Sequence, residues 1–263
     1  MEFTIGLAQV KRPDDGDVVG NVSRYARMAR KAGVDLLVFP EALMTRYDGS
    51  PERFAAQAQP ADGPFAREID GIAAREGLWM VYTINEANPS GGAPFNSAIV
   101  ADSSGCQRAQ YRKIHLFDAQ GFRESDYLSA GNAPMTPVEA PFARIGLGIC
   151  YDLRFPELAR ASALEGAQIM LYPAAWVDGP GKIMQWKTLL AARAIENGLF
   201  VAGAGSCDSG RIGHSCVFAP DGTLLAEGGD GEELITCRID TAEIERVRAK
   251  TPSLKHLRPE CYR

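Results

Sequence analysis

Short apolar runs and amphipathic stretches alternate along the first part of the chain. Residues 4–10 and 36–39 are apolar runs of the length typical of strands. Between them, Asp17 is a typical helix N-cap, and the apolar residues that follow recur at helical spacing as far as Gly33. The pattern therefore predicts a strand, a helix and a second strand in this order.

Three closely spaced apolar runs follow the next amphipathic stretch. Residues 65–76 have helical spacing, and residues 79–84, 96–101 and 106–112 are typical of strands, the last two joined by a DSSG turn. Antiparallel strands need only short connections of this kind. We therefore expect a helix followed by an antiparallel segment.

A long connection that contains glycine, residues 114–137, separates the two halves of the pattern. Loops of this length inside a compact domain are usually functional. Beyond it, the pattern predicts strands at 144–149, 168–172, 199–204, 214–218, 223–227 and 233–239, and helices at 155–165, 183–197 and 241–250. Helices placed before and after runs of hairpins imply sheets whose outer faces are covered by helices.

The composition is that of a globular protein with a substantial core. Of 263 residues, 46% are hydrophobic and 23% charged. The net charge of −5 and the scattered Lys and Arg argue against nucleic-acid binding. The first residues lack signal-peptide features, and no apolar run approaches the roughly 18 residues of a membrane span, so we expect a cytoplasmic protein with no membrane partner. The six cysteines include no CxxC pair, which favours free thiols over disulfides or zinc.

One cysteine lies where a predicted strand gives way to a predicted helix. Cys150 follows the apolar run 144–149, and Pro156 suits the first turn of the helix predicted over 155–165. Unpaired amides at such a turn and the positive end of the helix dipole both favour the thiolate form. Cys150 is therefore a candidate nucleophile, with a buried structural cysteine as the alternative.

A cysteine nucleophile needs a base, and the commonest partner is histidine. His256 lies in a polar C-terminal segment, where a solvated surface role is expected. For His214, which opens a predicted strand, and His115, at the start of the long connection, a structural hydrogen bond is favoured over catalysis. The sequence thus gives little support to a Cys–His pair.

Charged residues directly follow two other predicted strands. Glu41 follows a hydrophobic strand and a proline, a position where desolvation should raise the pKa of its carboxyl toward that of a general base. The strand predicted at 106–112 ends in Arg112 and is followed by Lys113, and one of these cations would lie beside a thiolate and a forming oxyanion. A helix cap or surface salt bridge is the alternative role for Glu41.

The chain resembles the nitrilase superfamily of carbon-nitrogen hydrolases in three segments, FPEALMTRY, YRKIHLF and GICYDLRFPEL, and the resemblance spans nearly all of its length. It implies that Glu41 is the general base, that Lys113 stabilises the tetrahedral intermediate, and that Cys150 is the nucleophile. The segment FRES resembles the family's second glutamate motif, which makes Glu124 a fourth member of the catalytic set.

The same resemblance implies a fold and an assembly. The fold is an α/β four-layer α-β-β-α sandwich, with two central mixed sheets covered by helices. One domain over 1–263 accounts for the pattern, with 251–263 as a C-terminal tail that contributes to dimerisation. A homodimer or higher homo-oligomer is expected, and the chemistry requires no metal or organic cofactor.

Residues beside the cysteine point to the substrate. True nitrilases usually carry tryptophan and glutamate after the nucleophile, whereas this chain has Tyr151 and Asp152, which indicates an amidase. The form CYDLRFPEL resembles the branch that contains ω-amidases and deaminated-glutathione amidases, which act on the terminal carboxamide of a small carboxylate-bearing acid. The backbone amide of Tyr151 is expected to share the oxyanion with Lys113.

Candidate substrate-binding residues follow from this reading. Arg154 either recognises the substrate carboxylate through its planar guanidinium or braces the fold by pairing with Glu157 or Asp152. Asn96 is interpreted as a turn or strand-end residue. Further pocket walls, each with plain packing as the alternative, are Tyr47, Tyr151 and Trp176.

Two rival functions remain open. Hydrolysis of N-carbamoyl amides would use the same Cys, Glu and Lys with a different pocket. A non-catalytic member that senses a metabolite or binds a partner would be expected to have lost part of the catalytic set, yet Glu41, Lys113, Glu124 and Cys150 are all present.

Overall fold

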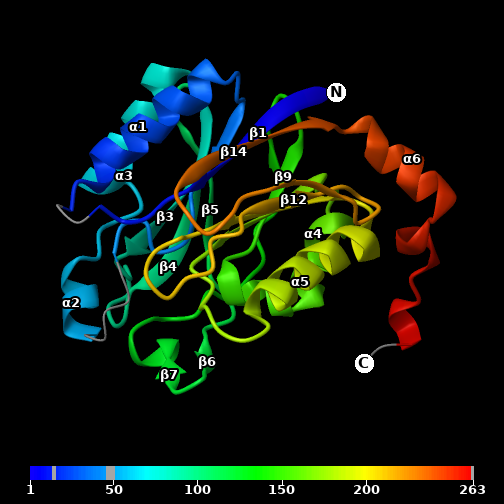
Figure 1. Ribbon diagram of the computed structural model, residues 1–263. Helices are drawn as coiled ribbons and strands as arrows, with labels where there is room; N and C mark the ends of the chain where they lie inside the picture. Colours follow the sequence, from blue (N-terminus) through cyan, green and yellow to red (C-terminus); the bar gives the residue numbers. More distant parts are fainter. Residues whose placement is uncertain (14–15, 46–50, 262–263) are drawn as a thin grey trace.

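Two six-stranded sheets form the centre of the computed structural model, which describes residues 1–13, 16–45 and 51–261 (Figure 1). The first sheet consists of β14 (Glu233–Asp240), β1 (Glu2–Gln9), β2 (Leu36–Val38), β3 (Trp79–Glu86), β4 (Phe95–Ala101) and β5 (Gln107–Arg112), in that order. Strands β1, β2 and β3 are parallel. Strands β3, β4 and β5 are antiparallel, which confirms the prediction for this segment.

The second sheet has the same number of strands. It consists of β13 (Leu224–Glu227), β12 (Cys216–Phe218), β11 (Phe200–Gly205), β10 (Ile169–Ala174), β9 (Arg144–Leu147) and β8 (Val138–Glu139), in that order. Its three central strands, β9, β10 and β11, are parallel, and antiparallel strands flank them on both sides. Both sheets are therefore mixed.

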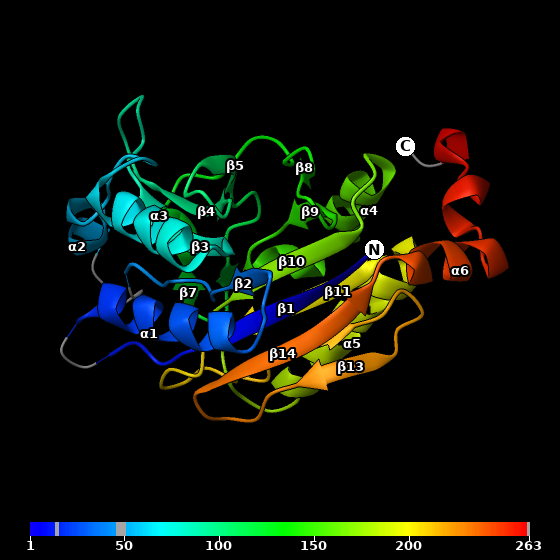
Figure 2. The same cartoon turned by 90° about the horizontal axis from the view of Figure 1, so that it is seen from above.

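Helices cover the outer face of each sheet (Figure 2). Helices α1 (Val18–Lys31) and α3 (Pro64–Glu76) pack on the first sheet, and α4 (Pro156–Leu164) and α5 (Lys182–Asn197) pack on the second. Helix α6 (Ala242–Lys250) follows β14, and the short α2 (Pro51–Ala56) precedes α3. The predicted four-layer α-β-β-α sandwich is confirmed.

Helix α1 shows how the sequence pattern produces this packing. The side chain of Asp17 accepts a hydrogen bond from the amide of Gly20 at 2.8 Å, which pairs one of the free donors of the first turn. The side chains that α1 buries against the sheet recur at the predicted helical spacing: Val18, Val22, Tyr25, Ala26 and Ala29.

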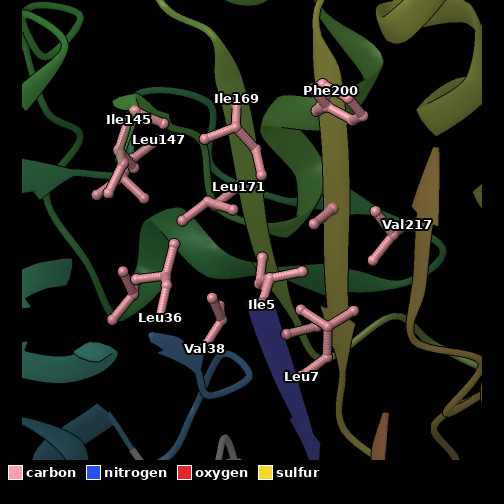
Figure 3. Packing of buried hydrophobic residues seen from close by; sticks show 14 of the residues in the cluster. Ile5, Leu7, Leu36, Val38, Ile145, Leu147, Ile169, Leu171, Phe200 and Val217 are labelled. Atoms are coloured by element: carbon pink, nitrogen blue, oxygen red, sulfur yellow. The ribbon is translucent and has the colours of Figure 1, made fainter. Parts of the chain in front are cut away.

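A continuous apolar core fills the space between the sheets (Figure 3). Ile5 and Leu36 from the first sheet face Leu147, Ile169 and Leu171 from the second, and all five are at most 1% exposed. Burial of one such side chain contributes about 1.5–3 kcal/mol. The interface holds the two sheets face to face, so loops that leave β2, β5 and β9 can meet.

The structure differs from the sequence prediction around these loops. A 3-10 helix, η2 (Cys150–Arg154), which was not predicted, lies between β9 and α4, whereas α4 itself begins at Pro156, in line with the helix predicted over 155–165. The long connection contains a hairpin of β6 (Asp118–Ala119) and β7 (Phe122–Arg123), followed by η1 (Glu124–Asp126). Elements of two to five residues are too short to show a hydrophobic period, and α2 was likewise not predicted.

No helix within residues 1–13, 16–45 and 51–261 combines the length and the apolar character needed to cross a lipid bilayer.

Candidate active site

The glutamate at the end of β2 lies on a tightly held turn. Glu41 is 4% exposed, and the next residue, Ala42, has a positive φ of 59°. The hydroxyl of Thr83 donates to the carbonyl of Pro40 at 3.0 Å and accepts from the amide of Leu43 at 3.2 Å. One side chain on β3 therefore fixes the backbone on both sides of Glu41.

The lysine at the end of β5 is almost completely buried. The backbone amide of Lys113 donates to the carbonyl of Asn96 at 2.8 Å, and its carbonyl accepts from the amide of Gly131 at 2.7 Å. Its Nζ donates to Oε1 of Glu41 at 2.9 Å and to both carboxylate oxygens of Glu124 at 3.0 and 2.8 Å. The predicted base, cation and second glutamate are thus in direct contact.

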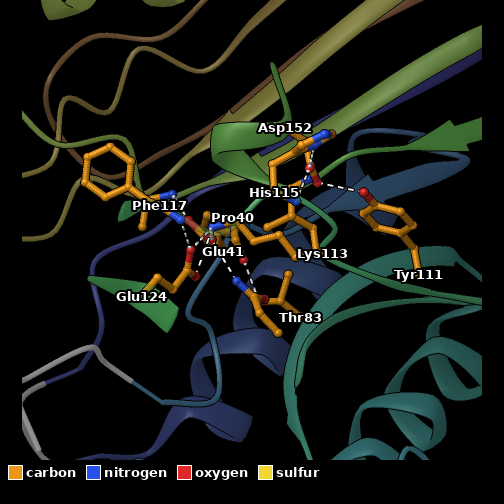
Figure 4. A network of polar contacts seen from close by, with 12 residues as sticks. Pro40, Glu41, Thr83, Tyr111, Lys113, His115, Phe117, Glu124 and Asp152 are labelled. Atoms are coloured by element: carbon orange, nitrogen blue, oxygen red, sulfur yellow. Dashed lines mark hydrogen bonds and ion pairs between the residues drawn. The ribbon is translucent and has the colours of Figure 1, made fainter. Parts of the chain in front are cut away.

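Further donors fix the two carboxylates (Figure 4). Glu124 accepts from the amide of Phe117 at 2.6 Å. Glu41 accepts from Nδ2 of Asn96 at 2.8 Å and, through its other oxygen, from the amide of Ala175 at 2.9 Å. Because Ala175 follows β10, this last bond ties the glutamate of the first sheet to the second sheet.

The cysteine lines the same pocket as Glu41, Lys113 and Glu124. Cys150 is the first residue of η2, is partly exposed, and has a positive φ of 47°. A left-handed backbone at a residue other than glycine costs about 1–3 kcal/mol and persists only where the surroundings impose it. The thiol lies close enough to Glu41 for the charge of that carboxylate to raise the pKa of Cys150, and both residues line the same pocket. Cys150, Glu41, Lys113 and Glu124 therefore form one cluster, which we call the floor.

The pKa values in the floor depart from the sequence prediction. Burial acts to raise the pKa of Glu41, but the charge and hydrogen bond of Lys113 outweigh it, and the net pKa is lowered. Burial acts to lower the pKa of Lys113, but Glu124 and Glu41 raise it well above its ordinary value. Burial and then the charge of Glu41 raise the pKa of Cys150.

The expectations of a raised pKa for Glu41 and of a stabilised thiolate at Cys150 are therefore wrong. Two carboxylates and one ammonium already give the floor a net charge of −1, and a thiolate would add a second negative charge to it. In the free protein the floor favours a neutral thiol beside an ionised Glu41.

A pocket of about 220 Å³ opens above the floor. Its walls include the aromatic side chains Phe117, Phe122, Tyr151 and Trp176. Three cations also line it, Arg154, Lys182 and Arg211, and we call these three the rim. Each rim residue is half-buried rather than closed off from solvent. The pocket thus combines an anionic floor with a cationic rim.

Arg154 is held by partners that the sequence did not indicate. Its Nη2 donates to Oε1 of Gln185 at 2.8 Å, and its guanidinium carbon lies 4.9 Å from the ring centroid of Trp176 and 6.0 Å from that of Tyr151. The alternative in which Arg154 braces the fold through Asp152 or Glu157 is not what the structure has. The guanidinium faces the pocket instead.

The remaining candidates are distributed as follows. Tyr151 and Trp176 line the pocket, whereas Tyr47 lies outside the described residues. His115 is hydrogen-bonded to Asp152, in line with a structural role.

His214 lies between Glu227 and Asp230, and His256 is exposed in the 3-10 helix Ser253–His256. Among the described residues, no cluster of three or more His, Cys, Asp or Glu side chains is arranged to hold a metal ion.

Sequence reasoning missed several residues of the site, including the pocket walls Phe117 and Phe122. Asn96, interpreted as a strand-end residue, lies within β4 and orients Glu41. Lys182 begins α5, and Arg211 follows a glycine in a loop. None of these positions stands out in a hydrophobic pattern, because each reaches the site only through the packing of the two sheets.

Comparison with known proteins gives consistent matches. Residues 4–249 match the family model described as carbon-nitrogen hydrolase. A deaminated glutathione amidase from Escherichia coli O157:H7 is 38% identical over 232 residues, which cover 88% of this chain and 87% of that protein. Saccharomyces cerevisiae Nit3, a member of branch 10 of the nitrilase superfamily, superposes with a TM-score of 0.85 at 30% identity, covering 95% of this chain and 94% of Nit3.

A third match concerns a protein with a modified cysteine. It is a variant of the amidase from Nesterenkonia sp. AN1 in which the acetamide moiety of fluoroacetamide is covalently added at the active-site cysteine. Its TM-score is 0.79 at 26% identity, and the match covers 100% of this chain and 95% of that one.

Proposed function

Because the chain belongs to the carbon-nitrogen hydrolase family, we propose that it is an amidase that converts the terminal carboxamide of a small, carboxylate-bearing acid to the free acid and ammonia. The observation that carries the substrate class is the rim, which places the cations Arg154, Lys182 and Arg211 around the pocket above the floor. The name of the Escherichia coli relative, deaminated glutathione amidase, supports the same substrate class.

The first half of the proposed reaction forms a thioester. Cys150 Sγ attacks the carboxamide carbon while Glu41 takes the thiol proton, so the floor keeps its net charge of −1 before the oxyanion develops. Glu41 then passes this proton to the departing nitrogen, and the C–N bond breaks to release ammonia. The raised pKa of Cys150 and the lowered pKa of Glu41 mean that proton transfer occurs during attack rather than before it.

The oxyanion of the tetrahedral intermediate needs donors that are already in place. Lys113 Nζ is held by Glu41 and Glu124, so its position is set before substrate arrives. The amide of Tyr151 in η2 is the second proposed donor. Preorganised donors of this kind contribute about 100- to 1,000-fold each to a rate.

The second half hydrolyses the thioester. Glu41 accepts a proton from water, whose oxygen attacks the thioester carbon, and the C–S bond breaks as the proton returns to Cys150 sulfur. Glu124 does not exchange protons in this scheme. It orients Lys113 through two hydrogen bonds. It also accepts from the amide of Phe117, which holds the start of the connection 114–137 next to Lys113.

The proposal is tested by ammonia release from four substrate types: amides with a distal carboxylate, neutral aliphatic amides, N-carbamoyl amino acids and nitriles. We expect the highest kcat/KM for amides with a distal carboxylate, and no release by the Cys150→Ala variant. A preference for N-carbamoyl substrates, with carbon dioxide released alongside ammonia, would replace the proposed substrate class. Ammonia release that persists at the wild-type rate in Cys150→Ala would remove the thioester mechanism.

We also propose an assembly, a domain organisation and a location for the protein. A homodimer is supported by large apolar side chains that are exposed on α4, α5 and β13, namely Leu164, Met184, Ile195, Leu224 and Leu225. We propose that this surface and the segment 251–263 take part in it, that one domain spans the chain, and that the protein is cytoplasmic. Light scattering of the purified protein gives the mass of the assembly directly.

A further inference from the structure

Two residues beyond the nucleophile lies a carboxylate with no exposed surface. Asp152 is 0% exposed and accepts four hydrogen bonds. Its Oδ2 accepts from the amide of Ile149 at 2.9 Å and from the hydroxyl of Tyr111 at 2.8 Å. Its Oδ1 accepts from the amide of His115 at 3.1 Å and from Nδ1 of the same residue at 2.7 Å. The two backbone amides and the Tyr111 hydroxyl donate to the carboxylate, and Nδ1 of His115 donates in the tautomer that carries its proton there.

The four donors belong to the two chain segments that carry the nucleophile and the lysine. Ile149 directly precedes Cys150, and Tyr111 and His115 each lie two residues from Lys113 (Figure 4). A single carboxylate therefore links the backbone before the thiol to one residue on each side of Lys113, through the hydroxyl of Tyr111 and through the amide and ring of His115. Since β5 belongs to the first sheet and β9 to the second, this link also crosses between sheets.

The turn at Cys150 explains why such a link is needed. Its positive φ of 47° is unfavourable for cysteine, so the surrounding bonds must impose it. The bond from Ile149 to Asp152 fixes the residue that enters this turn, and the amide of Asp152 donates back to the carbonyl of Ile149 at 3.0 Å. The side chain that holds the turn is the same one that holds the lysine segment.

The Asp152 group lies behind the site rather than in it. Among the described residues that line the pocket, Asp152, Tyr111 and His115 are absent, whereas Cys150 and Lys113 are present. The ring of His115 is stacked on Phe155, with centroids 3.6 Å apart and planes 6° apart. These residues have no path to substrate except through the groups they hold.

The geometry points to Asp152 as a positioning residue that sets the separation between Cys150 and Lys113, with His115 and Tyr111 as its two anchors on the lysine segment. This inference rests on the proposed function, because it assigns significance to that separation. Misplacement of reacting groups by about 1 Å costs on the order of 100-fold in rate. The loss should fall on kcat, because none of the four hydrogen bonds to the Asp152 carboxylate involves a rim residue.

The main test is Asp152→Asn, which keeps the size of the side chain. An asparagine has one accepting oxygen and one donating nitrogen, so either the amide of Ile149 or that of His115 is left facing a donor. We expect kcat for a carboxylate-bearing amide to fall by about 100-fold. KM should change by less than about threefold, because substrate contacts are retained. Circular dichroism and a titration of reactive thiol give the folded, active fraction used to normalise kcat.

A matched pair at His115 separates positioning from stability. In His115→Asn the side-chain nitrogen takes about the place of Nδ1 and still donates to Asp152, whereas in His115→Gln the nitrogen lies about where Nε2 was. Both variants lose the stacked ring. We expect His115→Asn to retain kcat within about threefold and His115→Gln to lose tens-fold, at similar melting temperatures.

Equal kcat in the two His115 variants, or a KM effect that matches the kcat effect in Asp152→Asn, would overturn the positioning role. Cys150→Ala serves as the reference in the same assay. If Cys150→Ala abolishes ammonia release while the two His115 variants have equal kcat, or while Asp152→Asn changes KM as much as kcat, the proposed function stands and only the positioning role fails. If Cys150→Ala still releases ammonia, the proposed function itself fails.

Discussion

The floor and the rim of the pocket are built in opposite ways. Glu41, Lys113 and Glu124 are at most 4% exposed and bonded to one another at 2.8–3.0 Å. Arg154 and Lys182 on the rim are half-buried, and Arg154 has a single side-chain hydrogen bond at 2.8 Å among the described contacts. A closed ion cluster resists change, whereas half-exposed cations can be exchanged at little cost. The proposed function assigns the reaction to the floor and the choice of substrate to the rim.

Removal of the central cation of the floor should have the largest effect. Lys113→Met would leave Glu41 and Glu124 buried side by side without their partner, which typically costs about 3–5 kcal/mol of unfolding free energy. We expect kcat to fall by about 1,000-fold or more, because an oxyanion donor is lost as well. Urea unfolding at pH 7 and steady-state ammonia release measure the two effects. A kcat within tenfold of wild type would show that the cluster is only structural.

A smaller effect is expected on the rim. Arg154→Ala removes one charge-assisted contact with the proposed substrate carboxylate, worth about 1.5–3 kcal/mol, or roughly 10- to 100-fold. The increase should appear in KM for carboxylate-bearing amides and be absent for a neutral amide of the same length. Arg108→Ala, at an exposed arginine on β5, is the matched control. Equal losses on charged and neutral amides would mean that Arg154 does not recognise a carboxylate.

The smallest change is expected across the neutral pH range. Glu41 has a pKa below its ordinary value of 4.5, and Cys150 has a pKa above its ordinary value of 9.0. The form with ionised Glu41 and neutral thiol therefore persists between them, and kcat/KM should vary by less than about twofold from pH 5.5 to 8. As the pH falls below 4.5 toward the lowered pKa of Glu41, the stability that its ionised form contributes is lost progressively, and below that lowered pKa the base is protonated. A titration midpoint of kcat/KM between pH 5.5 and 8 would contradict the directions of these two pKa shifts.

Features that depend on neighbouring residues could be predicted from the sequence, whereas features that depend on contacts between distant residues could not. The helix capped by Asp17 and all strands of the two sheets except β8 were predicted, because apolar spacing and capping are local properties. Glu41, Lys113 and Cys150 were found at strand ends, and Glu124 through the family resemblance of the segment FRES. The pKa of Glu41 was predicted in the wrong direction, because desolvation is visible in an apolar strand while the contact with Lys113, 72 residues away, is not.

The rim could not be predicted from the sequence for the same reason. Lys182 carries no local signal, and Gln185, the partner of Arg154, lies 31 residues further along the chain on α5. The 3-10 turn that begins at Cys150 is similarly invisible in the sequence, since its positive φ is imposed by bonds from Asp152 and the segment around Lys113. These features exist only once the two sheets have packed together.

The pairing of β1 with β14 has a consequence for synthesis in the cell. All eight residues of β1 are paired with β14, from Glu2 with Asp240 to Gln9 with Glu233. At a translation rate of about 5–20 residues per second, the first strand emerges on the order of 10–50 s before its partner. During that interval Ile5 and Leu7 belong to a sheet whose edge is still open. The nascent chain therefore has to be kept from aggregating until its last strand leaves the ribosome.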